Sequence, residues 1–285
     1  MRFGARALPA DRASVMAIVN RTPDSFYDRG VTYSEQAAMA AVDRAVQDGA
    51  DIVDIGGVKA GPGDEVDVAE EIRRVVPFVA AVRDRHPGLL ISIDTWRHEV
   101  ARPAAQAGAD IINDAWAGFD PQLAGVAAEY GCGMVCSHTG GASPRSRPHR
   151  VRYTDLVPEV TAELAAQAAK LTQLGVAREA ILIDPTHDFG KNTWHGLELL
   201  RRSDELVASG WPVLIALSNK DFIGETLDVG IDDRLEGSLA ATAIAAWAGV
   251  RVFRAHHVRP TRRVVDMVAS IAGTRPPARA LRGLS

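Results

Sequence analysis

A short apolar run, a polar loop and a longer Ala-rich segment recur along this chain, and this repeat constrains the fold more than any other feature. The apolar runs are rich in β-branched residues and do not alternate with polar ones, so both of their faces should be buried. Parallel strands covered by helices have this pattern. The predicted strands are Val15–Val19, Asp51–Ile55, Leu89–Ile93, Ala109–Ile112, Cys132–Cys136, Ala180–Ile183, Pro212–Leu217 and Gly249–Arg254. The predicted helices include Ser34–Asp48, Glu65–Arg85, Asp155–Gly175 and Leu235–Gly249.

Eight such units within about 250 residues predict an α/β fold, the (β/α)8 or TIM barrel. An open, doubly wound sheet is the structural alternative, but no G-x-G-x-x-G pattern follows a predicted strand, and the glycines from Gly56 to Gly63 have the wrong spacing. No linker or low-complexity segment divides the chain. We therefore expect one domain over residues 1–285, with a barrel core at about 14–272 and a flexible tail at 273–285.

Charge and composition narrow the choice of partners. The chain of 285 residues has 32 Lys and Arg against 36 Asp and Glu, which gives a net charge of -4 and argues against nucleic acid as the main partner. No apolar stretch approaches the ~20 residues of a membrane helix, and the N-terminus lacks a secretory signal. Cys132 and Cys136 are too few for a disulfide framework. We expect a cytoplasmic protein without membrane or nucleic-acid partners.

The functional residues of such a barrel lie where the strands end. Two carboxylates, two amides, two cations and two histidines stand at the predicted strand ends, and a mouth with both charge signs favours a ligand site. These residues are Asn20, Asp94, Asn113, His138, Asp184, Lys220, Arg254 and His256. Plainer roles are open for each. The aspartates and Asn113 suit turns, the cations suit ion pairs, and His138 suits a hydrogen-bonded core position.

The strand-end residues divide into two chemical groups. Asp94, Asn113 and Asp184 can hydrogen-bond the edge of a planar, nitrogen-rich ring, where a carboxylate makes paired charge-assisted bonds. Asn20, Arg254 and His256 follow the first and last strands, which become neighbours when a barrel closes. They suit a phosphate or diphosphate, and Asn20 also suits Mg²⁺. The residues alone do not name the ligand.

Several motifs resemble those of dihydropteroate synthases. Residues 16–26 read M-A-I-V-N-R-T-P-D-S-F, similar to the first signature of that family, N-V-T-P-D-S-F. Later segments resemble the family's further motifs in the same order over about residues 14–272, and together they are specific. They are Ser92–Thr95, Ile111–Asp114, Ile183–Lys191, Ser218–Gly224, Arg234–Ala241 and Arg254–His256.

The resemblance implies a pterin-binding barrel, usually a homodimer, that joins p-aminobenzoate to dihydropterin diphosphate with Mg²⁺ assistance. Carried over by motif, the residues that hold the pterin would be Asp94, Asn113, Asp184 and Lys220. Those that hold the diphosphate and metal would be Asn20, Arg254 and His256. Asp24, on the first loop, would help to assemble the closed site.

The departures from the family gather on the side that would hold p-aminobenzoate. The family's G-G-E-S-T-R-P-G loop reads G-G-V-K-A-G-P-G here, so that its Thr and Arg become Ala60 and Gly61. The family's S-R-K-S becomes S-N-K-D, which ends at Asp221, where the family's Ser opens a helix that receives the benzoate carboxylate. Arg21 replaces a small residue, and Thr186–Asp188 replaces an apolar, glycine-containing run. Lys59 or Arg21 is a candidate replacement cation.

Simple electrostatics then predicts weak binding of a benzoate. A helix N-terminus contributes about 0.3–1 kcal/mol to anion binding. A carboxylate such as that of Asp221 at ~4 Å from the substrate carboxylate costs about 1 to 4 kcal/mol. We therefore hypothesise that the chain is a divergent homologue of dihydropteroate synthase, resembling a second copy of the enzyme, with weak or no synthase activity. The alternatives are a functional synthase, a non-catalytic pterin-binding partner of one, a transferase with a neutral or cationic acceptor, and a Schiff-base enzyme that uses Lys220.

Overall fold

The computed structural model describes residues 1–22, 34–59, 61, 63–146 and 152–282. Eight parallel strands form one sheet in the order β8-β7-β6-β5-β4-β3-β10-β9. A bridge between Ile183 and Val213 brings its two edge strands together, and the Ile183 N–H donates to Pro212 O at 2.9 Å. The predicted (β/α)8 barrel is confirmed. The barrel strands are β3 (Ser14–Asn20), β4 (Ile52–Gly56), β5 (Leu90–Asp94), β6 (Ile111–Asp114), β7 (Gly133–Ser137), β8 (Ile181–Asp184), β9 (Leu214–Ala216) and β10 (Val252–Ala255).

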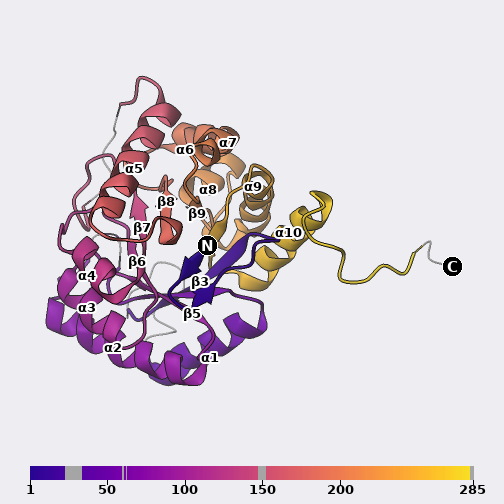
Figure 1. The fold of residues 1–285 in the computed structure, drawn as a ribbon. Coiled ribbons are helices and arrows are strands. Elements are labelled where there is room, and N and C mark those ends of the chain that lie inside the picture. The colour runs from indigo at the N-terminus through magenta and orange to yellow at the C-terminus, as the bar shows by residue number, and fades with distance from the viewer. Residues whose placement is uncertain (23–33, 60, 62, 147–151, 283–285) are drawn as a thin grey trace.

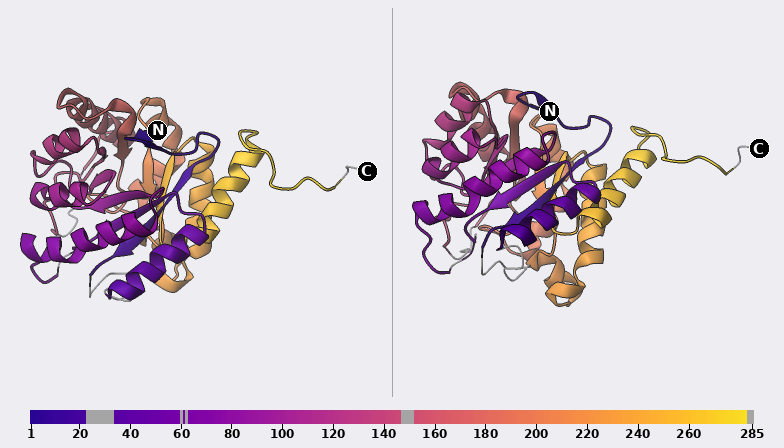
Figure 2. Two further views of the ribbon diagram at one scale, coloured as in Figure 1. Left: turned by 60° about the horizontal axis from the view of Figure 1, so that its bottom comes forward. Right: turned by 90° about the horizontal axis from the view of Figure 1, so that it is seen from below.

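Helices surround this barrel, as Figures 1 and 2 show. Local signals fix where several begin: Ser34 accepts the Ala37 N–H before the first helix, and Asp67 accepts the Glu70 N–H before the second. The two short helices between β8 and β9 were not among the predicted elements, whereas the helix expected to open at Asp221 is present. The helices are α1 (Glu35–Gln47), α2 (Val68–Arg85), α3 (His98–Gln106), α4 (Leu123–Tyr130), α5 (Leu156–Gln173), α6 (Thr193–Arg201), α7 (Ser203–Ala208), α8 (Asp221–Leu227), α9 (Leu235–Trp247) and α10 (Val258–Ile271).

One apolar side chain from each barrel strand fills the lower interior of the barrel. This layer consists of Met16, Ile52, Leu90, Ile111, Val135, Leu182, Leu214 and Val252. Phe3 and Leu8 cover it from the N-terminal hairpin of β1 (Arg2–Phe3) and β2 (Arg6–Ala7), which the sequence pattern did not predict. The fit is close, because a Cβ on Gly133 would lie 2.4 Å from the Phe3 ring. The hairpin therefore closes the end of the barrel opposite the carboxyl ends of the strands.

The alternation of side chains along each strand then decides what lies above this apolar layer. Two residues further along the strands, the inward positions change from Ile52 to Asp54, from Ile111 to Asn113 and from Val252 to Arg254. Ser92 and Asp184 hold the equivalent positions after Leu90 and Leu182. The interior thus changes within one pleat from a hydrophobic plug to a polar layer that leads to the mouth.

Residues 274–282 leave the end of α10 and extend away from the barrel (Figure 1). The start of this segment is tied down, because Thr274 Oγ1 donates to Asp11 O at 2.8 Å and Arg275 pairs with Asp266 at 2.7 Å. None of the helices in the described ranges has the length and apolar character needed to cross a membrane.

Candidate functional site

Asp54 organises the polar layer inside the barrel. Its carboxylate is fully buried and accepts hydrogen bonds from Ser92 Oγ at 2.6 Å, Asn113 Nδ2 at 3.1 Å and Arg254 Nε at 2.6 Å. Three strands besides its own thus supply donors to one carboxylate, which offsets the cost of burying the charge. This residue was missed from the sequence. The available signal was a charged side chain two positions after a buried one within an otherwise apolar strand.

Arg254 also contacts Asp94. This contact joins the two groups of residues that the sequence assigned to a ring and to a phosphate. Arg254 Nη2 donates to Asp94 Oδ2 at 2.9 Å. Burial raises the pKa of Asp94 to about 7, and the guanidinium opposes that rise. Two of the three guanidinium nitrogens are therefore used by carboxylates, and Nη1 is the one left to face a ligand among the described residues. Arg254 is held in one orientation before any ligand arrives.

Asp184 and Lys220 stand on neighbouring parts of the mouth. Asp184 is buried and accepts the Thr186 N–H at 2.8 Å, yet burial still raises its pKa to about 6. Lys220 Nζ forms an ion pair with Asp188, in the loop between β8 and α6. Lys220 was expected at the mouth, but this carboxylate partner was not identified from the sequence.

Asn20 lies at the carboxyl end of β3, and His256 directly follows the neighbouring strand β10. Asn20 ends β3 and is paired in register with Gly56 of β4, while His256 follows β10, which is hydrogen-bonded to β3. The His256 N–H donates to Ser218 Oγ at 3.2 Å, and burial lowers the pKa of its imidazole to about 3. Two of the predicted site residues, Asp24 and Ala60, lie outside the described residues.

A cavity of about 300 Å³ opens at this mouth. It is lined by Ile18, Asn20, Thr22, Val58, Lys59, Gly61, Asp94, Ser146, Asp188, Phe189, Ser218, Asn219, Lys220, Asp221, Arg254 and His256. The structure therefore brings together most of the described residues singled out from the sequence. Asn113 and Asp184 are buried in the same layer but do not line the cavity in the described part of the chain.

The acceptor side differs from the sequence-based expectation at Asp221. Arg234 Nη1 donates to Asp221 Oδ1 at 2.7 Å and also to Asn219 O at 2.9 Å. The Asp221 side chain is 73% exposed, whereas that of Arg234 is 13% exposed. The predicted repulsion ran from about 1 kcal/mol in water-like surroundings to about 4 kcal/mol in a half-buried site and included no partner for Asp221, so its upper figure is wrong for this exposed, paired carboxylate. Arg234 neutralises the charge, and solvent screens it further.

The two candidate replacement cations point in different directions. The Arg21 guanidinium lies 4.9 Å from the centre of the Phe78 ring, and its Nε donates to Arg74 O at 3.4 Å, so it is directed toward α2. Lys59 lines the cavity beside Gly61. Of the two, Lys59 is the cation that lines the cavity among the described residues.

Lys191 fixes the loop that carries Asp188. Its ammonium donates to the backbone oxygens of Phe189 at 3.0 Å, Thr186 at 3.1 Å and His138 at 3.2 Å, and it lies 2.8 Å from His138 Nδ1. His138 is thus a hydrogen-bonded core residue, as its plainer reading held. Thr186 has φ 49°, a left-handed conformation that is uncommon for a β-branched residue. The loop shape therefore depends on these contacts rather than on local preference.

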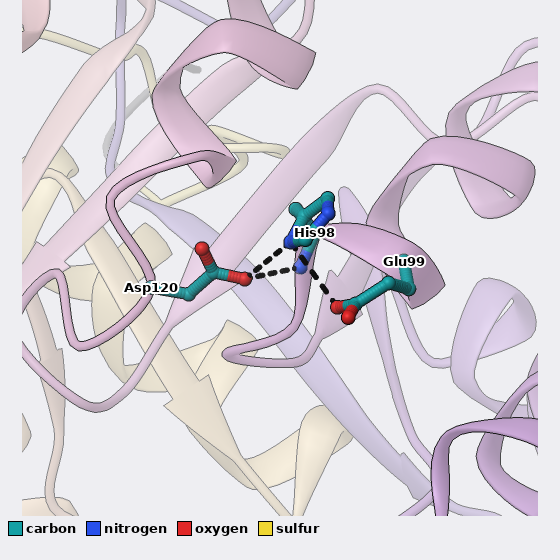
Figure 3. A group of neighbouring side chains, drawn as sticks. All are labelled: His98, Glu99 and Asp120. Carbon is teal, nitrogen blue, oxygen red and sulfur yellow. Dashed lines mark hydrogen bonds and ion pairs between the residues drawn. The ribbon is translucent and has the colours of Figure 1, made fainter.

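A separate polar cluster joins His98, Glu99 and Asp120, as Figure 3 shows. Asp120 Oδ2 accepts both the His98 backbone N–H at 2.8 Å and His98 Nδ1 at 2.7 Å, and Glu99 lies 3.1 Å from the same ring nitrogen. These bonds satisfy the start of α3, as side-chain acceptors at helix starts do. The cluster is absent from the cavity lining.

The fold is a parallel barrel whose mouth gathers carboxylates, amides and cations at the strand ends. The sequence profile of the family described as pterin binding enzyme matches residues 16–256. The chain belongs to this family. Within it, the chain is a divergent homologue of dihydropteroate synthase.

Individual relatives divide between two descriptions. The chain is 62% identical over 284 residues to "Inactive dihydropteroate synthase 2" of Mycobacterium leprae, with 98% of each chain covered. It is 39% identical over 268 residues to the dihydropteroate synthase of Escherichia coli strain K12, covering 93% of this chain and 94% of that one. A solved structure of Yersinia pestis dihydropteroate synthase with a sulfonamide drug complex aligns with a TM-score of 0.88 at 33% identity, covering 94% and 97%.

Proposed function

We propose that the protein binds a pterin and its diphosphate in the barrel mouth and has weak or no dihydropteroate synthase activity. The observation that carries the binding half is the layer built on Asp54, which holds Asn113 and Arg254 in fixed orientations. Such preorganisation lowers the ordering cost of binding a flat, polar ring. Asp94, Asn113, Asp184 and Lys220 would hold the pterin ring, whose N–C–N edge matches a carboxylate in two parallel bonds.

The diphosphate would lie across the ends of β10 and β3. Arg254 offers Nη1, His256 offers a neutral imidazole at pH 7, and Asn20 offers an amide. Asn20 would hold Mg²⁺ at this corner, where its Oδ1 lies 3.6 Å from the point that a Cβ on Gly56 would occupy. Oxygen donors suit Mg²⁺, which usually completes its shell with substrate phosphates and water. When bound there, Mg²⁺ would offset negative charge on a departing diphosphate.

The loss of synthase activity is proposed from the acceptor side and the relatives. Gly61 and Ala60 stand where dihydropteroate synthases have Arg and Thr, and Asp221 stands where they have Ser. A relative covering 98% of this chain is named inactive. Asp24, proposed as a catalytic residue with Lys220, belongs to the same synthase chemistry and is retained in the sequence.

A functional synthase is the second candidate, and one observation favours it. Arg234 neutralises Asp221, so the negative charge that would reject a benzoate is compensated. The Escherichia coli relative is named dihydropteroate synthase without qualification. The two candidates differ in turnover and not in pterin binding.

Calorimetric titration with dihydropterin diphosphate tests the binding half. The expected result is saturable binding by the natural protein, at least about tenfold weaker binding by Asp184→Asn, and unchanged binding by the surface variant Asp204→Asn. Asp204 is exposed on α7, on the outside of the barrel. No binding, or equal binding by the Asp184→Asn variant, would contradict the proposed pterin site.

We also propose that the protein is a homodimer formed through α9 and α10. These helices lie side by side (Figure 1) and expose Ile244, Trp247, Met267 and Ile271 to between 55% and 65%. Exposed apolar groups of this kind mark interaction surfaces, and a two-fold contact buries the same surface on both copies. Light scattering should give twice the chain mass for the natural protein and a monomer for Trp247→Glu. A natural protein that stays monomeric at micromolar concentration would contradict this proposal.

A further inference from the structure

The charges that line the cavity nearly cancel within the protein itself. Among the described residues, three carboxylates and three cations line it: Asp94, Asp188 and Asp221 against Lys59, Lys220 and Arg254. An anionic ligand therefore meets cations of which some are already engaged by carboxylates, and which cation receives it depends on how the internal pairs are made.

Two of the three cations are held by carboxylates of the chain. Arg254 contacts Asp54 at 2.6 Å and Asp94 at 2.9 Å. Lys220 pairs with Asp188. The third carboxylate, Asp221, is taken by Arg234 from outside the cavity lining. Asp188 and Lys220 are only partly exposed, so water screens their attraction less than it would at an open surface.

The backbone holds Asp188 in place beside Lys220. Thr186, two positions before it, and Phe189, directly after it, both offer their carbonyl oxygens to the Lys191 ammonium, at 3.1 and 3.0 Å. Thr186 is fixed again by its N–H bond to Asp184 at 2.8 Å. Since the backbone on both sides of Asp188 is anchored, its carboxylate stays near the mouth without a ligand. The pair with Lys220 is therefore a built feature of the cavity.

Lys59 is the lining cation that has no carboxylate partner among the described residues. It follows β4, whose last residue, Gly56, is paired in register with Asn20 of β3. Because β3 lies between β4 and β10 in the sheet, Lys59 lines the cavity on the side of β3 opposite β10. An anionic group placed there gains an ammonium without displacing any internal carboxylate.

We propose that Asp188 is a specificity-determining residue that withholds Lys220 from anions, so that the outer phosphate of the ligand is received by Lys59. This inference rests on the proposed pterin and diphosphate site and adds the direction in which the phosphate chain runs. The phosphate chain runs from Arg254 and Asn20 toward the β4 side. Lys220 is left to donate to neutral acceptors on the ring.

Titration with inorganic pyrophosphate at fixed ionic strength tests this assignment. Asp188→Asn keeps the shape of the side chain but removes the charge that competes for Lys220. We expect its pyrophosphate affinity to rise about tenfold above that of the natural protein. We expect Lys59→Met to lose about tenfold. The surface variants Asp204→Asn and Lys170→Met should match the natural protein. A gain of affinity cannot come from misfolding, and thermal denaturation checks that Lys59→Met is folded.

The contrary outcomes are equally definite. Unchanged or weaker pyrophosphate binding by Asp188→Asn would overturn the role of Asp188, as would no detectable binding by either form. Unchanged binding by a folded Lys59→Met would overturn the role of Lys59. A parallel titration with the phosphate-free 6-hydroxymethylpterin separates this inference from the proposed function. Failure of that neutral ring to bind contradicts the pterin site, whereas the pyrophosphate titrations test the charges alone.

Discussion

Arg254 and Asp54 are 200 residues apart in the chain, yet Arg254 Nε donates to Asp54 Oδ2 at 2.6 Å inside the barrel. The bond joins the last barrel strand to the second and passes across the interior rather than along the rim. It converts a strand-end arginine into a rigid part of the mouth. The proposed ligand site depends on this fixed orientation of Arg254.

Replacing Asp54 by Asn should therefore weaken both the fold and the site. The variant keeps the volume but leaves Arg254 with one carboxylate instead of two, and the amide group faces the donor of Asn113. We expect the free energy of unfolding to fall by about 1–3 kcal/mol, as for a buried polar group left poorly paired. Urea denaturation measures this change, with Asp204→Asn as the control. A loss no larger than that of the control would contradict the structural role.

The free energy of unfolding should depend on pH through the protonation of Asp184. Because burial raises its native pKa to about 6 from the ordinary value of 3.8, the native carboxyl binds its proton more tightly than the unfolded one. The contribution of Asp184 to stability is therefore greatest below about pH 4 and falls by about 3 kcal/mol as the pH rises through 6.

Comparison with Asp184→Asn isolates that contribution. Buried His138, His187 and His256 have lowered pKa values of about 3 and act in the opposite direction, since protons on the unfolded imidazoles destabilise the native state below pH 6.5. They are common to both proteins. The difference in unfolding free energy, natural protein minus Asp184→Asn, should fall between pH 4 and pH 7. A difference that stays constant would contradict the raised pKa.

Two glycines offer a matched test of the barrel plug. A Cβ on Gly133 would meet Phe3 at 2.4 Å and Ala180 O at 2.6 Å, whereas nothing lies within 4 Å of a Cβ on Gly125 in α4. Gly133→Ala should cost about 1–3 kcal/mol through overpacking. Gly125→Ala should stabilise by about 0.5–1 kcal/mol, because glycine disfavours a helix. Thermal and urea denaturation measure both, and equal effects would show that the hairpin does not pack against β7.

Lys191 offers a test of how the Asp188 loop is held. Lys191→Met removes the donor shared by the carbonyls of His138, Thr186 and Phe189. We expect a loss of about 1–3 kcal/mol from the unpaired carbonyls. Hydrogen exchange should also become faster in residues 185–190, with Lys170→Met as the control. Unchanged exchange in that loop would show that Lys191 is not what fixes it.

Much of the fold followed from the sequence because a parallel barrel repeats one signal eight times. Unbroken β-branched runs marked the strands, and Ser34 and Asp67 act as side-chain caps at two helix starts. The N-terminal hairpin did not follow, since its two strands have two residues each and carry no pattern. Its role depends on Phe3 reaching the bottom of the barrel, which is a tertiary contact.

The site was predicted in part, and for a related reason. Strand ends are visible in a sequence, so Asn20, Asp94, Lys220 and Arg254 were found at the cavity. Which charged side chains pair with one another is not visible in a sequence. Asp54 lies inside a strand, and Arg234 reaches Asp221 across 13 residues. That last pair overturned the upper figure of the predicted repulsion, because a charge count without geometry cannot show which charge is neutralised.

The rate of dihydropteroate formation from dihydropterin diphosphate and p-aminobenzoate, measured with saturating Mg²⁺, tests whether this barrel binds the pterin without synthase turnover. A dihydropteroate synthase of ordinary activity serves as the positive control, and bound pterin diphosphate is verified in the same preparation. The account predicts binding with turnover at least about 10³-fold below the control, against the 1–10³ s⁻¹ of typical enzymes. Turnover within tenfold of the control, or a protein that binds no pterin diphosphate, would contradict it.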